Sequence, residues 1–139
     1  MSIFSKKELV IKKTYAGPLK RTLYPNGSVV VTIDGYFYIR GNKRYRIISD
    51  RVLLSWSFPK VIQSTEFAVE HLRVSGKLGF RDGTLINNVA DGKLYLISEN
   101  KRRPITNPDW LTILNFDIHE ALVVSDEEAN LHEDGVELK

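Results

Sequence analysis

The chain has 139 residues and a net charge of +3, with 42% hydrophobic and 27% charged residues, so it can form one domain or two very small ones, which excludes a multidomain enzyme. It has no cysteine, which excludes disulfide bonds, thiolate metal sites and a cysteine nucleophile. No apolar run approaches the roughly 20 residues that span a bilayer, and the N-terminus lacks the apolar core of a signal peptide, so we expect synthesis and folding in the cytoplasm.

The charge changes sign along the chain. Residues 1–50 carry ten Lys and Arg against three Asp and Glu, whereas residues 101–139 carry four against nine. The basic N-terminal part could contact nucleic acid. Alternatively, the basic part of one copy could bind the acidic C-terminal part of another, so that identical copies associate head to tail. Solvated charged faces are the alternative interpretation.

The first 25 residues are basic and stand outside the pattern of the remaining chain. Within them, residues 8–13 are predicted as a strand and Gly17-Pro18 as a turn. We expect residues 1–25 to form an arm that docks on a partner through its six basic side chains, Lys6, Lys7, Lys12, Lys13, Lys20 and Arg21.

Residues 26–80 are predicted to form a first repeat. A hairpin of residues 36–40 and 43–48 turns at Gly41-Asn42, where either residue suits positive φ. Two short helices follow, each after a capping residue: 52–57 after Ser49 or Asp50, and 66–72 after Thr65. We expect Gly76 to break the chain after the second helix.

Residues 81–139 are predicted to form a second repeat that begins with a similar hairpin. Residues 93–98 alternate between two faces, as a short strand does. Residues 101–105 return as the partner strand, and Pro104 should end their ladder or hold the strand at an edge, because proline has no N–H to donate.

Two short helices are predicted in the rest of the second repeat. Asn107-Pro108 provides an N-cap followed by proline at the first helical position, so a helix over residues 110–115 is expected to bury Trp110, Ile113 and Leu114. After an extended segment over 121–124, Ser125 and Glu128 match a capping box, which predicts a last helix to about residue 131.

The two halves share landmarks in the same order. The matched pairs are Gly27 with Gly83, Asp34-Gly35 with Asp91-Gly92, Asn42-Lys43-Arg44 with Asn100-Lys101-Arg102, Phe58 with Phe116, and Thr65-Glu66 with Ser125-Asp126. The sequence therefore predicts an α+β fold of two tandem repeats of about 55 residues, each a small antiparallel β-hairpin or sheet plus two short helices, with an N-terminal arm.

The second half carries a family resemblance in four segments, DGTLI, DGKLYLIS, NKRRPIT and ALVVSDEE. Together they resemble a roughly 50-residue surface repeat found in bacterial extracytoplasmic proteins and phage virion proteins. The resemblance covers residues 82–135 well and residues 26–76 more weakly, because Tyr45-Arg46 replaces the Arg-Pro of the motif. It implies a noncatalytic attachment module without a defined ligand.

This resemblance, together with the expected cytoplasmic synthesis, predicts a structural or adaptor component of a phage particle. We expect the protein in the virion, at the neck, tail or capsid surface, as a homo-oligomer in a symmetric assembly that contacts other virion proteins. The alternative is a cell-envelope or glycan-binding module used in host recognition. Retention on purified cell wall that is lost on mutation of Tyr95 or Trp110, if these side chains are exposed, would favour that alternative.

No catalytic residues, metal or cofactor are predicted. The histidines His71, His119 and His132 occur in no metal-ligand spacing and are each expected to be surface or half-buried residues. The acidic tail lacks the pattern of a calcium loop, and no serine lies in a GxSxG motif.

Three arginines are candidates for binding at the repeat surface: Arg44, Arg102 and Arg103. The alternative is that they support their own hairpins, with stems that cover apolar surface and head groups that pair with carboxylates. Aromatic residues among the basic side chains of the first hairpin, such as Tyr38 and Tyr45, could instead stack on a nucleic-acid strand. We consider nucleic-acid binding unlikely, because a similar basic triplet recurs in the acidic half.

Overall fold

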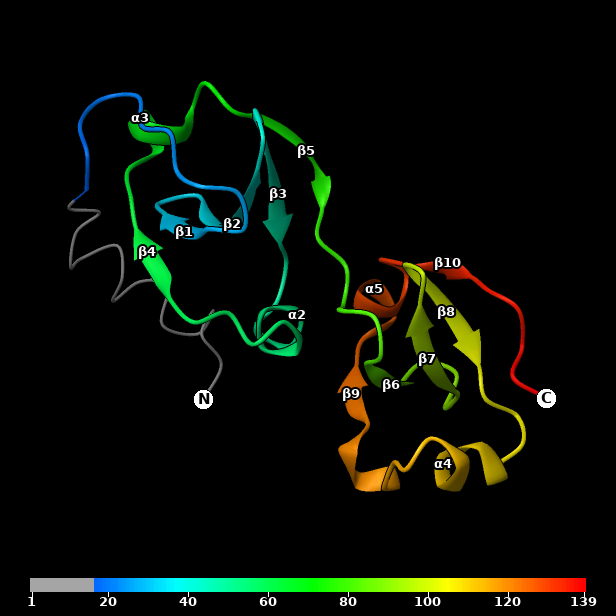
Figure 1. Ribbon diagram of the computed structural model, residues 1–139. Helices are drawn as coiled ribbons and strands as arrows, with labels where there is room; N and C mark the ends of the chain where they lie inside the picture. Colours follow the sequence, from blue (N-terminus) through cyan, green and yellow to red (C-terminus); the bar gives the residue numbers. More distant parts are fainter. Residues whose placement is uncertain (1–16) are drawn as a thin grey trace. The chain divides into compact units, whose positions relative to one another are not determined.

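The computed structural model describes residues 17–139, which form two compact units that meet between Leu78 and Gly79 (Figure 1). The boundary predicted from the sequence lies two residues later, between residues 80 and 81. Over the described residues, ten strands form two mixed sheets, and four short α-helices accompany them. The mixed α+β class is thus confirmed. No helix of this part of the chain is long and apolar enough to cross a membrane.

Unit 1 is a five-stranded sheet with the order β4-β1-β2-β3-β5. Its elements in chain order are β1 (Val29–Thr32), β2 (Gly35–Arg40), β3 (Lys43–Ile47), α2 (Asp50–Ser55), β4 (Val61–Gln63), α3 (Glu66–Val69) and β5 (Arg73–Lys77). The three central strands are antiparallel, whereas β4 and β5 lie parallel to β1 and β3, respectively. The predicted small antiparallel hairpin or sheet corresponds to these central strands, but the complete sheet is mixed, because each outer strand returns to it through a short helix.

The predicted hairpin and caps of unit 1 are confirmed. Gly41, at φ 62°, turns β2 into β3, where a residue with a Cβ atom would be strained. The Ser49 side chain caps α2 and the Thr65 side chain caps α3. However, α3 ends at Val69, and Gly76 lies within β5 and does not break the chain.

The core of unit 1 lies between the sheet and α3. Buried side chains of β1, β2, α3 and the residues that follow α3 form one cluster: Val30, Phe37, Ile39, Val69 and Leu72. All four residues of β1 are buried, as expected for a central strand covered on both faces. Helix α2, which follows β3 in the chain, contacts that strand and buries Val52 and Leu53.

Unit 2 has the same strand order, β9-β6-β7-β8-β10. Its elements are β6 (Leu85–Asn88), β7 (Leu94–Ser98), β8 (Lys101–Pro104), α4 (Asp109–Ile113), the 3-10 helix η2 (Ile118–Glu120), β9 (Leu122–Val124), α5 (Asp126–Ala129) and β10 (Glu133–Asp134). The three central strands are again antiparallel and the two outer strands parallel. Each strand of unit 1 therefore has a counterpart in unit 2, in the same order along the chain.

Side-chain hydrogen bonds also occur at corresponding places in the two units. Thr32 Oγ1, at the end of β1, donates to Glu66 Oε2 at 3.0 Å, and Asn88 Nδ2, at the end of β6, donates to Asp126 Oδ1 at 3.1 Å. In both cases the acceptor is the first residue of the helix that follows the outer strand. One polar contact thus fixes the helix to the first strand in each unit.

Two predictions for unit 2 were wrong. Ile113 of α4 is 65% exposed and the helix buries no residue completely, because the short helix lies at the periphery of the unit (Figure 1). His132 is only 3% exposed, in contrast to the expected surface or half-buried position. The hairpin of β7 and β8 and the capping box of Ser125 and Glu128 are confirmed.

Candidate functional site

Arg44 lies inside unit 1 and is 8% exposed. Its Nη2 is 2.6 Å from Glu66 Oε1, its Nε donates to the Leu72 carbonyl oxygen at 3.0 Å, and its guanidinium lies 4.6 Å from the centre of the Phe37 ring. Burial raises the pKa of Glu66, but the hydrogen bond and charge of Arg44 outweigh this effect and hold that pKa below its usual value. These contacts favour a supporting role of Arg44 in its own fold.

Arg102 occupies the corresponding position of unit 2. Arg44 faces Ile39 across its hairpin and Arg102 faces Ile97, and each guanidinium lies over an aromatic ring, that of Tyr95 at 5.1 Å for Arg102. Arg102 Nε donates to Asp134 Oδ1 at 2.8 Å, and Nη1 donates to Asn130 Oδ1 at 3.0 Å. Like Arg44, Arg102 thus holds the hairpin to the chain segment after the last helix of its unit.

Tyr95 contributes a second polar link under Arg102. The Tyr95 side chain is 4% exposed, and its hydroxyl donates to Asp91 Oδ2 at 2.9 Å. Burial and the hydrogen bond to Asp91 raise the pKa of the Tyr95 hydroxyl. Because Tyr95 is buried, it does not meet the condition under which its mutation would test ligand binding.

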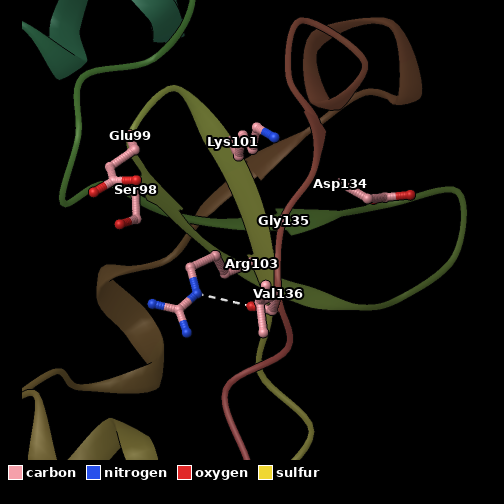
Figure 2. A pocket seen from close by; sticks show the side chains of 7 residues that line it. All are labelled: Ser98, Glu99, Lys101, Arg103, Asp134, Gly135 and Val136. Carbon is pink, nitrogen blue, oxygen red and sulfur yellow. Dashed lines mark hydrogen bonds between the residues drawn. The ribbon is translucent and has the colours of Figure 1, made fainter.

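Arg103 points to a different environment, a cavity of about 690 Å³ beside the turn between β7 and β8 (Figure 2). The cavity is lined by seven residues: Ser98, Glu99, Lys101, Arg103, Asp134, Gly135 and Val136. Arg103 Nε donates to the Val136 carbonyl oxygen at 2.8 Å. Figure 2 shows the Asp134 side chain on the far side from the Arg103 guanidinium, in agreement with its pairing to Arg102.

The chemistry of this cavity is that of a polar binding surface. The cations Lys101 and Arg103 supply hydrogen-bond donors, and the carboxylates of Glu99 and Asp134 supply acceptors. A serine hydroxyl is present, but no histidine lines the cavity as its base. Side chains of both charge signs suit contact with a protein segment better than binding of a single small ion. Of the three candidate arginines, Arg103 alone lines this cavity.

The described part of the predicted arm is fastened to unit 1. The Thr22 amide donates to the Ala68 carbonyl oxygen at 3.0 Å, and the hydroxyls of Tyr24 and Ser64 share a hydrogen bond of 2.8 Å. Thr65 Oγ1 also donates to the Pro18 carbonyl oxygen. Lys20 and Arg21 remain exposed on this segment. The other four candidate residues, Lys6, Lys7, Lys12 and Lys13, and the strand predicted over 8–13 lie outside the described residues.

Four aromatic side chains form a cluster on unit 1, and only two of them, Tyr38 and Tyr45, were expected at one surface. Tyr38 of β2 and Tyr45 of β3 face each other across the hairpin, and Tyr38 also lies near the rings of Trp56 and Phe58. The Trp56 and Phe58 rings stack at 6.0 Å with an angle of 15° between their planes. All four rings are half-buried. The Trp-x-Phe spacing directly after the first helix was the signal that could have completed this cluster.

The histidines are separate from one another. His132 is buried in unit 2, His71 is half-buried in unit 1, and His119 is exposed on η2. Among the described residues, no group of three or more His, Cys, Asp or Glu is placed to hold a metal ion. Comparisons of the chain with family models, with curated proteins and with solved structures found no significant match.

Proposed function

We propose that this protein is a noncatalytic structural or adaptor component of a phage particle, which contacts other virion proteins at the neck, tail or capsid surface. The observation that carries the proposal is the occurrence of one five-stranded arrangement twice in succession. In both units, buried or half-buried arginines hold the fold together, and the open cavity offers polar groups suited to protein contact. The resemblance of residues 82–135 to a surface repeat of virion proteins also supports this role.

We further propose that the two units are tandem copies of one repeat of about 55 residues. Supporting this are the common strand order and the paired contacts of Thr32 with Glu66 and of Asn88 with Asp126. A duplicated unit gives two similar surfaces on one chain, which is suited to bridging neighbouring subunits in a symmetric assembly. We also propose that the protein is synthesised in the host cytoplasm and is then assembled into the virion.

The experiment is to detect the protein by mass spectrometry in phage particles purified by density gradient and washed at high salt. A high-salt wash removes basic proteins that adhere only through surface charge. Stoichiometric comigration with the particles is expected, and the copy number would indicate a capsid, ring or fibre position. Absence from the particles already before the high-salt wash would overturn the proposed virion role.

The aromatic cluster of unit 1 favours a second candidate function, binding of a cell-envelope glycan during host recognition. Tyr38, Tyr45, Trp56 and Phe58 gather apolar ring area at one place, and the hydroxyls of the two tyrosines add polar tips. Ligand sites combine aromatic surface with a few polar groups in this way.

This second function is tested by retention of the protein on purified cell wall. Trp56→Ala should lose retention, whereas Trp110→Ala, a change of the half-buried tryptophan in unit 2, should keep it. Trp110 Nε1 donates to the Lys139 carbonyl oxygen, so the control also reports the effect of losing a structural tryptophan. Failure of the unmodified protein to bind cell wall, or equal losses in both variants, would contradict glycan binding by this cluster.

A further inference from the structure

The described parts of the two units carry net charges of opposite sign. Residues 17–78 have ten Lys and Arg against four Asp and Glu, a net charge of +6. Residues 79–139 have six Lys and Arg against twelve Asp and Glu, a net charge of −6. Because the boundary between these ranges is the boundary between the units, the charge asymmetry of the sequence is an asymmetry between two folded bodies.

The same inversion occurs at one pair of corresponding strands. β5 is the last strand of its sheet, beside β3, and β10 is the last strand of its sheet, beside β8. Arg73 pairs with Lys43 at the start of β3, and Glu133 pairs with Lys101 at the start of β8, so Arg73 and Glu133 occupy the same position in their units. Both are exposed. At this pair of corresponding positions, the edge of unit 1 is therefore basic and the edge of unit 2 is acidic.

Both edges also combine charge with exposed apolar surface and open backbone. Val74 of β5 is 43% exposed, and Val136, just after β10, is 76% exposed. Among the described residues, no strand pairs with the outer side of β5 or of β10. Unpaired edge strands are templates for pairing with another chain. The opposite edges, β4 and β9, consist of uncharged residues and offer no such complementarity.

We propose that the β5 edge of one copy binds the β10 edge of a second copy of this chain, head to tail. Opposite charges at Arg73 and Glu133 set the pairing, and the exposed valines add apolar contact. Two different edges meet in each contact, so the contact is heterologous and repeats into a ring or a filament. The proposal deepens the structural role proposed above and rests on it for its setting in a particle.

The strands themselves limit the contact to a short one. β10 has two residues, and the register of β5 shifts between Arg44 and Arg46 of its neighbour β3. Such an irregularity twists an edge and prevents a long, flat ladder. We therefore expect weak association led by charge, which salt dissociates because the Debye length falls from about 10 Å at 0.1 M to about 3 Å at 1 M.

The test is sedimentation velocity over a range of protein concentrations, at low salt and at 1 M salt. The unmodified protein should associate at low salt and dissociate at high salt. Lys77 is the last residue of β5, and the half-buried Glu137 follows β10 by three residues. R73E/K77E and E133K/E137K should each weaken self-association by at least about tenfold, because each variant carries like charge on both edges. An equimolar mixture of the two variants should associate again, because each then meets an edge of opposite sign.

The matched control is K20E/K60E, which changes the net charge by as much as R73E/K77E does but alters exposed residues away from β5. It should associate as the unmodified protein does. Should a reversed variant unfold, R73Q/K77Q and E133Q/E137Q replace the pair, and each should weaken association. A monomer at every concentration, or a control as impaired as R73E/K77E, would overturn the proposal. A monomer found in washed particles would overturn this proposal alone and leave the virion role standing.

Discussion

The backbone N–H of Phe80 donates a hydrogen bond to Nε2 of His132 at 2.9 Å. The other ring nitrogen, Nδ1, lies 2.9 Å from the carbonyl oxygen of Asn100, an acceptor, so Nδ1 carries the proton. The ring is therefore neutral and joins the start of unit 2 to the hairpin turn. In unit 1 the corresponding position holds Leu72, which packs in the hydrophobic cluster.

We predict that acidification weakens unit 2 through His132. Burial lowers the pKa of His132 from 6.5, against the hydrogen bond to Asn100 and the charge of Asp82, which raise it; the nearby Arg102 lowers it further. The depressed pKa means that the unfolded chain takes up the proton first. The stability from this group is therefore complete above pH 6.5 and is lost as the pH falls from there toward the folded-state pKa.

Thermal unfolding between pH 7.5 and 5 measures this effect. His132→Gln should lower the melting temperature at pH 7.5 and flatten its dependence on pH. His119→Gln changes an exposed histidine and should leave the pH dependence intact. A pH dependence that persists in His132→Gln would show that another group causes it.

A second prediction compares the two hairpin arginines. The Arg44 and Glu66 side chains are 9% and 27% exposed, whereas Asp134, the partner of Arg102, is 69% exposed. Arg44→Met leaves the half-buried carboxylate of Glu66 without its cation and should cost about 2 kcal/mol, between the costs for exposed and for buried pairs. Arg102→Met should cost about 1 kcal/mol, because Asp134 can be solvated by water.

Urea unfolding, followed by the amide signals of each unit, measures both costs separately. Arg44→Met should lower the midpoint of unit 1, and Arg102→Met should lower that of unit 2 by a smaller amount. The pKa of Glu66 lies below 4.5, so the contribution of this group is present above that pH and is lost as the pH falls through the folded-state pKa. Equal costs in the two units would contradict the role assigned to burial.

Local signals in the sequence predicted the hairpins and caps well. Gly41-Asn42 and Glu99-Asn100 turn the two hairpins, and Ser125 caps its helix through contacts within four residues. The alternating pattern of residues 93–98 likewise predicted a strand with two different faces, and the structure buries the face that carries Tyr95 and Ile97. Such signals depend only on neighbouring residues, so the sequence contains them completely.

Features that depend on distant contacts were not predicted. The outer strands have two to five residues, too few for a pattern to show whether they lie parallel or antiparallel. His132 is buried because Phe80 and Asn100, far away in sequence, supply its hydrogen-bond partners. The cavity beside Arg103 is likewise lined in part by residues 134–136. No local pattern in the sequence indicates that this C-terminal segment returns to the hairpin.

The third prediction concerns the close approach of Gly17 to β4. A Cβ atom at this position would lie 2.9 Å from Ser64 Cα and 3.2 Å from the Gln63 carbonyl oxygen, both backbone atoms that cannot turn aside. Gly17→Ala should therefore loosen the segment that the Thr22 amide holds to Ala68. Hydrogen exchange at the Thr22 amide should become faster. Leu19→Ala, at an 81% exposed position, serves as control and should leave the exchange rate unchanged.

The last prediction concerns the basic N-terminal segment and compares two truncations of it. Removal of residues 1–25 deletes the hydrogen bonds of Thr22 and Tyr24 to unit 1, so it should lower the melting temperature of that unit. Removal of residues 1–16 leaves these bonds and should preserve the melting temperature.

If the segment anchors the protein, the shorter truncation should still reduce incorporation into phage particles, because it removes Lys6, Lys7, Lys12 and Lys13. Quantitative mass spectrometry of purified particles, together with thermal unfolding of both truncated proteins, provides the two readouts. A loss of incorporation without a loss of stability in the shorter truncation would separate attachment from folding. Normal incorporation of this variant would assign attachment to the two units themselves.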